Sequence, residues 1–205
     1  MAIADKKIIE ELRCDIKNES PEYVTSKWII EKIPYIFGED KPLYLRIKHK
    51  LSILLNVDSC SIIFVGSAGT GFSLNPNKGF KTFDDSSDID IAIVSNYYFE
   101  IAWQAIINVD VEKQMPKVKE SIYDHRKRLI YYGTIATDKI LGLMPFAQQW
   151  LLAIQRLSEE SIFENREIHF RLYRNHESLR AYHVNNIRVS FANMIDDKPE
   201  IVEIN

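Results

Sequence analysis

The chain has 205 residues, of which 46% are hydrophobic and 27% charged, and its formal net charge is −3. This length and this composition provide enough apolar surface for one folded domain, which excludes disorder as the default state. The slightly acidic balance argues against a constitutive nucleic-acid coat protein, although a local basic groove is compatible with it.

Cysteine usage and hydropathy indicate a protein of the cytoplasm. The chain has two cysteines, Cys14 and Cys60, too few for a disulfide framework or a metal knuckle, which favours a reducing compartment. The N-terminus carries charges throughout and lacks the apolar core of a signal peptide. No apolar run approaches the roughly 18 residues that a membrane-spanning helix needs, so we expect no membrane association.

The first quarter of the chain is predicted to be helical. Ile8, Ile9, Leu12 and Ile16 recur at helical spacing, and the proline after Ser20 disfavours helical geometry in its predecessor. The pattern predicts a first helix that stops before Ser20. Further helices are expected from 21 to about 33 and from 43 to 55.

A strand, a glycine-rich turn, a loop and a second strand follow. Residues 60–65 are mostly β-branched or aromatic, as in a buried strand, and Gly66 ends the run. Residues 66–71 form the glycine-rich turn, and residues 72–87 have the composition of an irregular loop. The segment 88–95 predicts the second strand, with two aspartates at its start.

The remainder of the chain predicts helices and one more strand. We expect a helical pattern at 97–128 with an interruption near 109–116, and a further helix at 146–157. A strand at 167–173 and a last helix from 175 or 176 through 187 follow. The tail from 196 is acidic and is expected to form an edge or a loose end. The expected fold class is α+β: one domain over 1–205, with a small mixed β-sheet flanked by N-terminal and C-terminal helices. Within it we distinguish a motif core at about 60–95, a helical extension at about 96–160, and a strand with the last helix at about 166–192.

Asp88 and Asp90 are the strongest candidates for chemistry. They are two residues apart on a predicted strand, so both side chains leave the same face, roughly 7 Å apart at the backbone, while Ile89 and Ile91 point into the core. Mg²⁺ prefers one or two carboxylates plus the phosphates of a substrate. The pair therefore predicts a site for a metal–nucleotide complex, with Mg²⁺, or alternatively Mn²⁺, as the cofactor.

The glycine-rich turn is the candidate phosphate-binding element. Gly66 ends a strand without a side chain in the way, Ser67 supplies a hydroxyl, and Gly69 and Gly71 let backbone N–H groups approach an anion. In the loop that follows, Lys78 and Lys81 are placed either to cover phosphates or simply to be solvated. A P-loop and a dinucleotide-binding loop are poor alternatives, because neither Gly-Lys-Ser/Thr nor the third glycine is present.

This part of the chain resembles the polymerase-beta-like nucleotidyltransferase superfamily. The resemblance lies in the order of a strand, Gly66-Ser67, a further glycine and then Asp88-Ile89-Asp90. The resemblance covers about 61–95. It implies that Gly66 and Ser67 hold nucleotide phosphates and that Asp88 and Asp90 bind Mg²⁺ during transfer of a nucleoside monophosphate, with release of pyrophosphate. The loop between the two motifs is longer than in the minimal members of the superfamily.

The resemblance also implies a third carboxylate from a neighbouring strand, which acts as general base and metal ligand. Our candidate is Glu167, at the start of the predicted third strand, with His169 and Arg171 on the same face; Arg171 is also a candidate nucleotide-binding residue. If Glu167 points away, the protein binds a nucleotide without catalysing transfer.

Several alternatives stay open. The aspartate pair is also compatible with the polar face of an edge strand. The basic residues Arg126–Arg128, Arg171, Arg174 and Arg180 could line a channel for a triphosphate or RNA, but we favour solvated surfaces for this set. The preferred function is nucleotidyl transfer from a nucleoside triphosphate to a hydroxyl of a protein, an RNA or a small molecule. The alternative is a catalytically weak or inactive regulatory module, of the antitoxin-like or antiviral-defence type, that acts by binding a protein partner.

Overall fold

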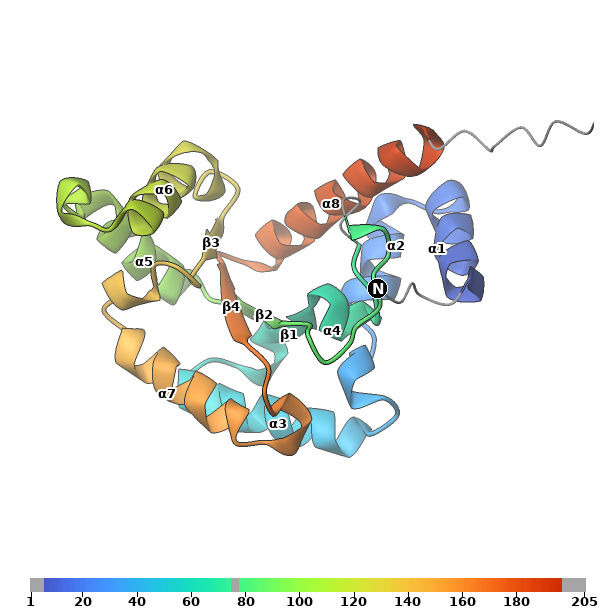
Figure 1. The fold of residues 1–205 in the computed structure, drawn as a ribbon, viewed down its shortest axis with the longest axis horizontal. Helices are drawn as coiled ribbons and strands as arrows, with labels where there is room; N and C mark the ends of the chain where they lie inside the picture. Colours follow the sequence, from blue (N-terminus) through green and yellow to red (C-terminus); the bar gives the residue numbers. More distant parts are fainter. Residues whose placement is uncertain (1–5, 75–77, 197–205) are drawn as a thin grey trace, which may run out of the picture.

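The computed structural model describes residues 6–74 and 78–196, with side chains as far as Val189, so residues 75–77 of the predicted loop and nearly all of the acidic tail lie outside the described part. Figure 1 shows an α+β fold in which helices surround a small sheet. The helices are α1 (Lys6–Asn18), α2 (Pro21–Thr25), α3 (Lys41–Leu55), α4 (Gly66–Thr70), α5 (Asn96–Asn108), α6 (Pro116–Asp124), α7 (Ala147–Ser158) and α8 (His176–Asp196). The strands are β1 (Ile62–Val65), β2 (Ile89–Val94), β3 (Thr134–Ala136) and β4 (Ile168–Tyr173).

The sheet is mixed, with strand order β1-β2-β4-β3. β2 pairs antiparallel with β1 and parallel with β4, and β3 pairs antiparallel with β4. A parallel pair requires a crossover connection, and the segment from α5 to α7 provides it. The strand order makes β2 and β4 the two inner strands. The aspartate pair therefore does not lie on an edge strand, as one of our alternatives supposed.

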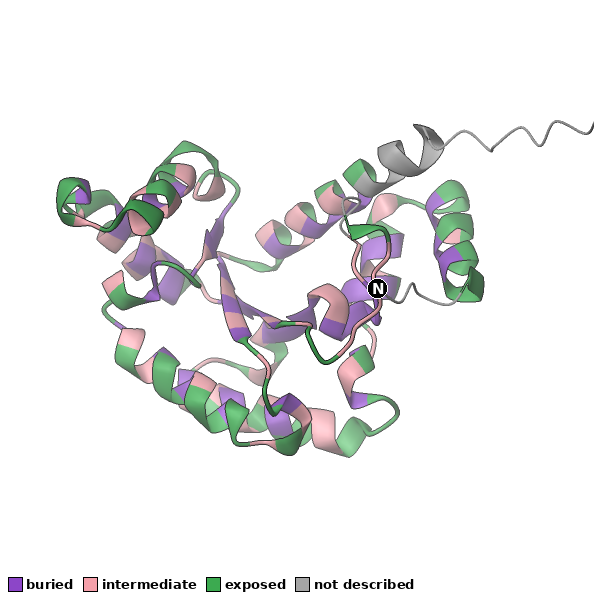
Figure 2. Cartoon of the chain, viewed as in Figure 1, coloured by how far each residue is buried: buried purple, intermediate pink, exposed green. Residues whose placement is uncertain are grey.

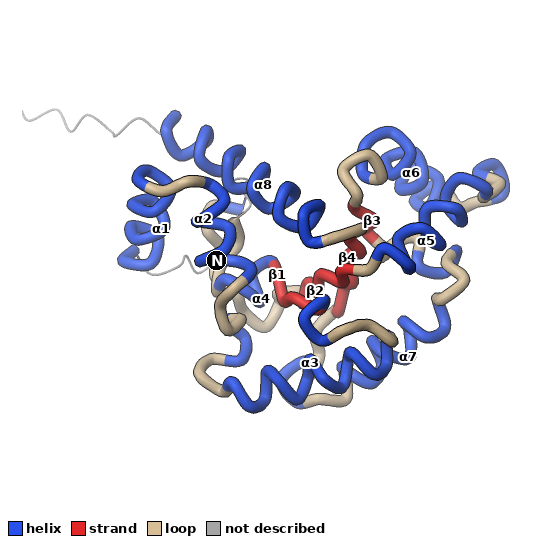
Figure 3. Tube along the Cα trace, turned by 180° about the vertical axis from the view of Figure 1, so that it is seen from behind, coloured by secondary structure: helices blue, strands red, loops and turns tan. Residues whose placement is uncertain are grey.

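Side chains alternate between the two faces of the sheet, and each face has its own apolar cluster. Figure 2 shows that the strands are mostly buried. On one face, isoleucines of β1 and β2 pack with Phe64 and Phe170 against α3, α5 and α7. On the other face, Ala92, Val94 and Tyr173 pack against α1, the segment after α2 and α8. The view from behind shows α3 and α7 along one side of the sheet and α8 with α1 and α2 along the other (Figure 3).

Three local predictions differ from the structure. The second predicted helix is α2 followed by a π-helical turn, Ser26–Ile30, and it ends a few residues before the expected boundary. The glycine-rich turn folds into the short helix α4, which Gly71 ends with a φ of 94°. β3 lies inside the segment that we predicted to be a helical extension, because three residues are too few to show an alternating pattern.

The described helices also bear on the membrane prediction. None of them combines the length and the apolarity that crossing a bilayer requires.

Candidate functional site

A pocket of about 620 Å³ opens beside the sheet, between the strand ends, α4, the following loop and α8. Its walls contain both predicted motifs together with residues far away in the chain. The residues that line it are Ile29, Gly66, Ser67, Thr70, Ser73, Leu74, Lys78, Lys81, Thr82, Ser86, Ser87, Asp88, Asp90, Arg171, Tyr182, His183, Asn186 and Val189.

The two aspartates reach this pocket as the alternating pattern predicts. Ile89 and Ile91 are fully buried behind them, whereas Asp88 is exposed and Asp90 half-buried. Both carboxylates are pocket-lining groups. β2 is an inner strand, and Asp90 lies between Val65 of β1 and His169 of β4, whereas Asp88 directly precedes β2.

Gly66 and Asp90 fit closely against each other. Gly66 has a φ of 62°, and a β-carbon at this position would lie 2.5 Å from Oδ2 of Asp90. Burial raises the pKa of the Asp90 carboxyl above its ordinary value, although the positive charges of Arg171 and His169 act in the opposite direction. The glycine of the first motif is therefore required for the position of the second aspartate.

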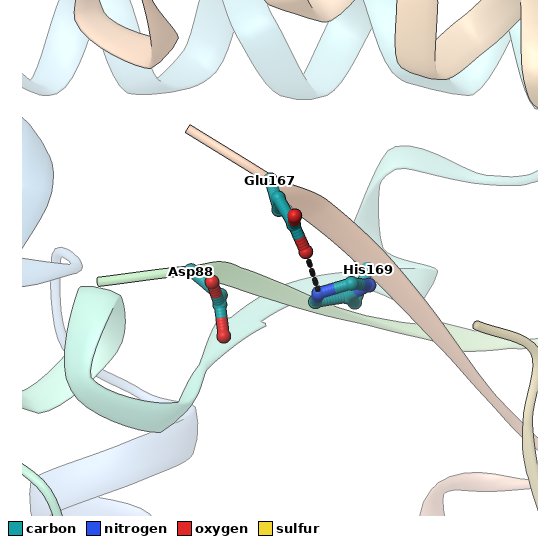
Figure 4. Close-up of side chains that lie close together, drawn as sticks. All are labelled: Asp88, Glu167 and His169. Atoms are coloured by element: carbon teal, nitrogen blue, oxygen red, sulfur yellow. Dashed lines mark ion pairs between the residues drawn. The ribbon is translucent and has the colours of Figure 1, made fainter. Parts of the chain in front are cut away.

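Glu167 lies at the same end of the sheet as Asp88 and Asp90. The N–H of Ile89 donates to the carbonyl of Glu167 at 2.8 Å, and Asp90 lies beside His169 in the parallel pair. Asp88, Glu167 and His169 each present a ligand atom, and these atoms all lie within 4.8 Å of one another. Figure 4 shows the Glu167 carboxylate turned toward the ring of His169, with a distance of 3.4 Å between Oε2 and Nε2, and Asp88 on the neighbouring strand.

The structure thus places an imidazole, not a carboxylate, directly beside Asp90. The predicted third carboxylate, that of Glu167, lies two residues before His169 in the chain and beside Asp88. Glu167 precedes the first residue of β4 and its side chain is 80% exposed. Glu167 and His169 are not among the residues that line the pocket, but the exposed side chain of Glu167 can change its rotamer.

Arg171 lies deeper in the pocket, on the same face of β4. Its Nη1 donates to the hydroxyl of Tyr182 at 2.7 Å, and its guanidinium lies over the ring of the same residue at 5.1 Å. Tyr182 belongs to α8, so this contact joins the sheet to the helix that closes the pocket. The pair provides a fixed positive group with an aromatic ring beside it.

The other predicted phosphate-binding residues separate into two groups. Ser67 and Lys78 line the pocket, and Lys78 is exposed there. Gly69 does not line it: a β-carbon at Gly69 would lie 2.7 Å from the carbonyl oxygen of Phe64. Gly69 thus allows α4 to pack closely on β1.

The remaining basic candidates are occupied elsewhere. Arg126 donates to the carbonyls of Ile106, Ile107 and Val109 at the end of α5. Three other arginines contact groups of their own surroundings: Arg128 pairs with Asp124, Arg174 lies over Phe99, and Arg180 donates to Ser26. None of these four arginines lines the pocket, but Arg171 does, and Arg174 is half-buried with its Nε inaccessible to solvent, so the solvated surface that we favoured is wrong for these two residues.

Sequence reasoning missed two residues of the site. His183 is 7% exposed and lines the pocket, and its Nε2 has no hydrogen-bond partner among the described residues. Arg166 donates to the carbonyls of Asp84 and Ser87, pairs with Asp85 at 3.0 Å and thereby fixes the chain just before Asp88. Neither residue belongs to a recognisable motif, because each acts through partners far away in the sequence.

Comparison of the chain with protein-family models, with curated proteins and with solved structures found no match. Function is therefore inferred from the residues of the pocket.

Proposed function

We propose that the protein is a magnesium-dependent nucleotidyltransferase that moves a nucleoside monophosphate from a nucleoside triphosphate to a hydroxyl acceptor. The observation that carries this proposal is the convergence of Asp88, Asp90, Gly66 and Ser67 on one pocket. A volume of about 620 Å³ is within the usual range for small-molecule sites. The pocket also contains Lys78 and Arg171, which suit an anionic ligand.

The donor atoms suit a hard cation with a phosphate ligand. Asp88, directly before β2, and Asp90, within β2, both line the pocket, and Mg²⁺ is commonly bound by one or two carboxylates together with substrate phosphates. The raised pKa of Asp90 means that its ionised form is disfavoured without a cation. When bound, Mg²⁺ would neutralise charge on the transferred phosphate.

Each residue has a distinct role in this reaction. Ser67 and Lys78 hold phosphate oxygens, and Arg171 positions the nucleotide from the deeper wall. Glu167 accepts the proton of the acceptor hydroxyl as its oxygen attacks the α-phosphorus. The bond from the α-phosphorus to the bridging oxygen breaks, and pyrophosphate leaves.

The test is calorimetric titration of the protein with each nucleoside triphosphate in the presence of Mg²⁺. We expect one triphosphate to bind the intact chain and not the double variant Asp88→Asn, Asp90→Asn. The matched control is Asp58→Asn, Asp110→Asn, because these exposed aspartates accept backbone hydrogen bonds that asparagine also accepts.

Two outcomes contradict the proposal. One is a folded protein that binds no triphosphate, which would favour the regulatory module that binds a protein partner. The other is binding that persists in the Asp88, Asp90 double variant. Where binding is found, release of pyrophosphate with protein, RNA and small-molecule acceptors then separates an active enzyme from a nucleotide-binding module.

A further inference from the structure

The pocket has two walls of different chemistry. The strand ends, α4 and the following loop provide hydroxyl, ammonium and carboxylate groups, among them those of Ser67, Lys78 and Asp90. α8 provides the second wall, and none of its described residues that line the pocket is charged at neutral pH. These residues are Tyr182, His183, Asn186 and Val189. A ligand that fits both walls has a strongly anionic part and an uncharged part.

The α8 wall contains a buried polar group that indicates a ligand. His183 is 7% exposed, and within the described part of the chain its Nε2 has no hydrogen-bond partner. Burial lowers the pKa of its imidazole to about 4, so near pH 7 one ring nitrogen is a donor and the other an acceptor. A buried polar atom without a partner is costly unless a ligand or a water satisfies it. This wall therefore has hydrogen-bonding capacity that a bound molecule can use.

Two neighbours of His183 contribute further groups to the α8 wall. Asn186 follows three residues later, a spacing that places two helical side chains on the same face, and both line the pocket. The hydroxyl of Tyr182 accepts a hydrogen bond from Arg171 at 2.7 Å, which holds the ring in place. The rings of Tyr182 and His183 are 5.3 Å apart and nearly perpendicular. An aromatic ring, an imidazole and an amide thus lie close together on this wall.

Apolar side chains border the same part of the pocket. Ile29 lines the pocket and belongs to the apolar cluster that contains Leu179 and Ile187 of α8. Leu74 also lines the pocket and packs against this cluster. Small-molecule sites typically combine apolar contacts with a few polar groups that fix the orientation of the ligand. A flat, uncharged ring system with hydrogen-bonding groups at its edge suits this combination.

The polar groups of the α8 wall favour one nucleobase. An asparagine amide pairs with the amino group and a ring nitrogen of adenine, whereas guanine is usually bound by arginine or lysine and cytosine by a carboxylate. The α8 wall provides Asn186 and the neutral His183. Arg171, which also lines the pocket, donates to Tyr182. Adenine is therefore the base that this wall fits best.

We propose that Tyr182, His183 and Asn186 form the binding site for the base of the nucleoside triphosphate, and that this base is adenine. This inference rests on the proposed function, because it names the nucleotide and the residues that select it. The triphosphate then lies toward Ser67 and Lys78, while His183 and Asn186 pair with the edge of the base.

The experiment compares the affinities of the full chain for ATP, GTP, CTP, UTP and inorganic triphosphate in calorimetric titrations with Mg²⁺. Inorganic triphosphate contains the anionic part of the ligand and lacks the base. We expect ATP to bind at least about tenfold more tightly than each of the other four, because one or two additional hydrogen bonds correspond to about this factor.

Variants of the α8 wall test the residues that we assign. Asn186→Ala should reduce the affinity for ATP by about tenfold and leave the affinity for inorganic triphosphate within about twofold. The matched control is Asn185→Ala, which removes the same side chain from an exposed position outside the pocket and should change neither affinity. His183→Phe keeps a ring and removes both nitrogens, so it should resemble Asn186→Ala. Thermal unfolding of each variant checks that the fold is retained.

The outcomes distinguish this inference from the proposed function. A preference for ATP that depends on His183 and Asn186 supports the base site, even if ATP binding persists in the Asp88, Asp90 double variant or no pyrophosphate is released. Equal affinities for ATP and inorganic triphosphate, a preference for another base, or an unchanged preference in folded Asn186→Ala overturns the base site. Each of these results does so even if triphosphate binding requires Mg²⁺, Asp88 and Asp90. A folded chain that binds no triphosphate overturns both proposals.

Discussion

The two faces of the central sheet are made by alternate residues of the same strands, yet they differ in what they bury. The face toward α3, α5 and α7 consists of closely packed aliphatic and aromatic side chains, with Phe64 between Phe37 and Phe163. The opposite face is apolar at Ile63, Val65, Ala92, Val94 and Tyr173. On β2 and β4 the same face also carries the polar residues Asp90, His169 and Arg171, and Asp90 and Arg171 line the pocket.

The difference between the two faces explains how the fold tolerates its site. One face supplies continuous apolar burial, and the other includes polar groups that are half-buried or unpaired, such as Asp90 and His183. Strained or unsatisfied groups persist where the surrounding structure holds them, and they are typical of functional sites. We therefore expect substitutions on the first face to change stability and substitutions on the second to change binding.

The largest effect is expected on the packed face. Phe64 is fully buried and contacts three aromatic rings, so Phe64→Ala should reduce the free energy of unfolding by about 3–5 kcal/mol. Urea denaturation measures this loss. The control Ile53→Ala removes an exposed side chain of α3 and should change stability by less than about 0.5 kcal/mol. Equal effects of the two substitutions would contradict the comparison.

The second-largest effect is a loss of stability at low pH that depends on His183 in the pocket. Burial lowers the pKa of His183 from 6.5 to about 4, and the charge of Arg171 acts in the same direction. Because the folded-state pKa lies below the unfolded one, His183 contributes stability above about pH 6.5 that is lost as the pH falls toward 4. Stability changes by about 1.36 kcal/mol for each unit by which the two pKa values differ, so the loss of stability reaches up to about 3 kcal/mol.

Unfolding measured across this pH range tests the assignment to His183. The variant His183→Gln should show a shallower fall in stability than the intact chain, because glutamine does not titrate. His49→Gln, at an exposed histidine, should follow the intact chain. If His183→Gln and the intact chain lose stability in parallel, the acid sensitivity has another origin.

A smaller effect is expected at the contact between the two motifs. Gly66→Ala forces a side chain into a left-handed conformation, at a cost of about 1–2 kcal/mol, and also places a methyl group against the Asp90 carboxylate. Gly38→Ala is the matched control, because Gly38 has a φ of 54° and nothing within 4 Å of its added β-carbon. We expect both variants to lose stability in thermal unfolding and only Gly66→Ala to lose binding of metal and nucleotide in calorimetry. Retained binding in Gly66→Ala would show that the contact is unimportant for the site.

The smallest expected effect has the opposite sign. Since burial raises the pKa of Asp90, ionisation of its carboxyl opposes folding near neutral pH, and Asp90→Asn should raise the melting temperature of the metal-free protein. The control Asp110→Asn, at an exposed aspartate, should leave it unchanged. A lower melting temperature of Asp90→Asn would mean that Arg171 and His169 stabilise the ionised form more than burial opposes it.

Local sequence patterns predicted the parts of the structure that depend on neighbouring residues. The alternation of Asp88, Ile89, Asp90 and Ile91 predicted which side chains enter the core and which leave it, because the side-chain period of a strand is two. The segments of β1, β2 and β4 and the helices α1, α3, α7 and α8 were likewise predicted from local patterns. The resemblance implied that Gly66 lies near the aspartate pair, and in the structure Gly66 lies against Asp90.

Only the tertiary structure decided how distant segments meet. The register of β4 against β2 places His169, not Glu167, beside Asp90, and a shift of two residues would exchange them without changing any local pattern. The same applies to α8, which brings Tyr182 and His183 to the pocket, and to Arg166, which holds the chain before Asp88. These contacts arise from strand pairing and packing between distant segments, and local periodicity does not specify which distant segments meet.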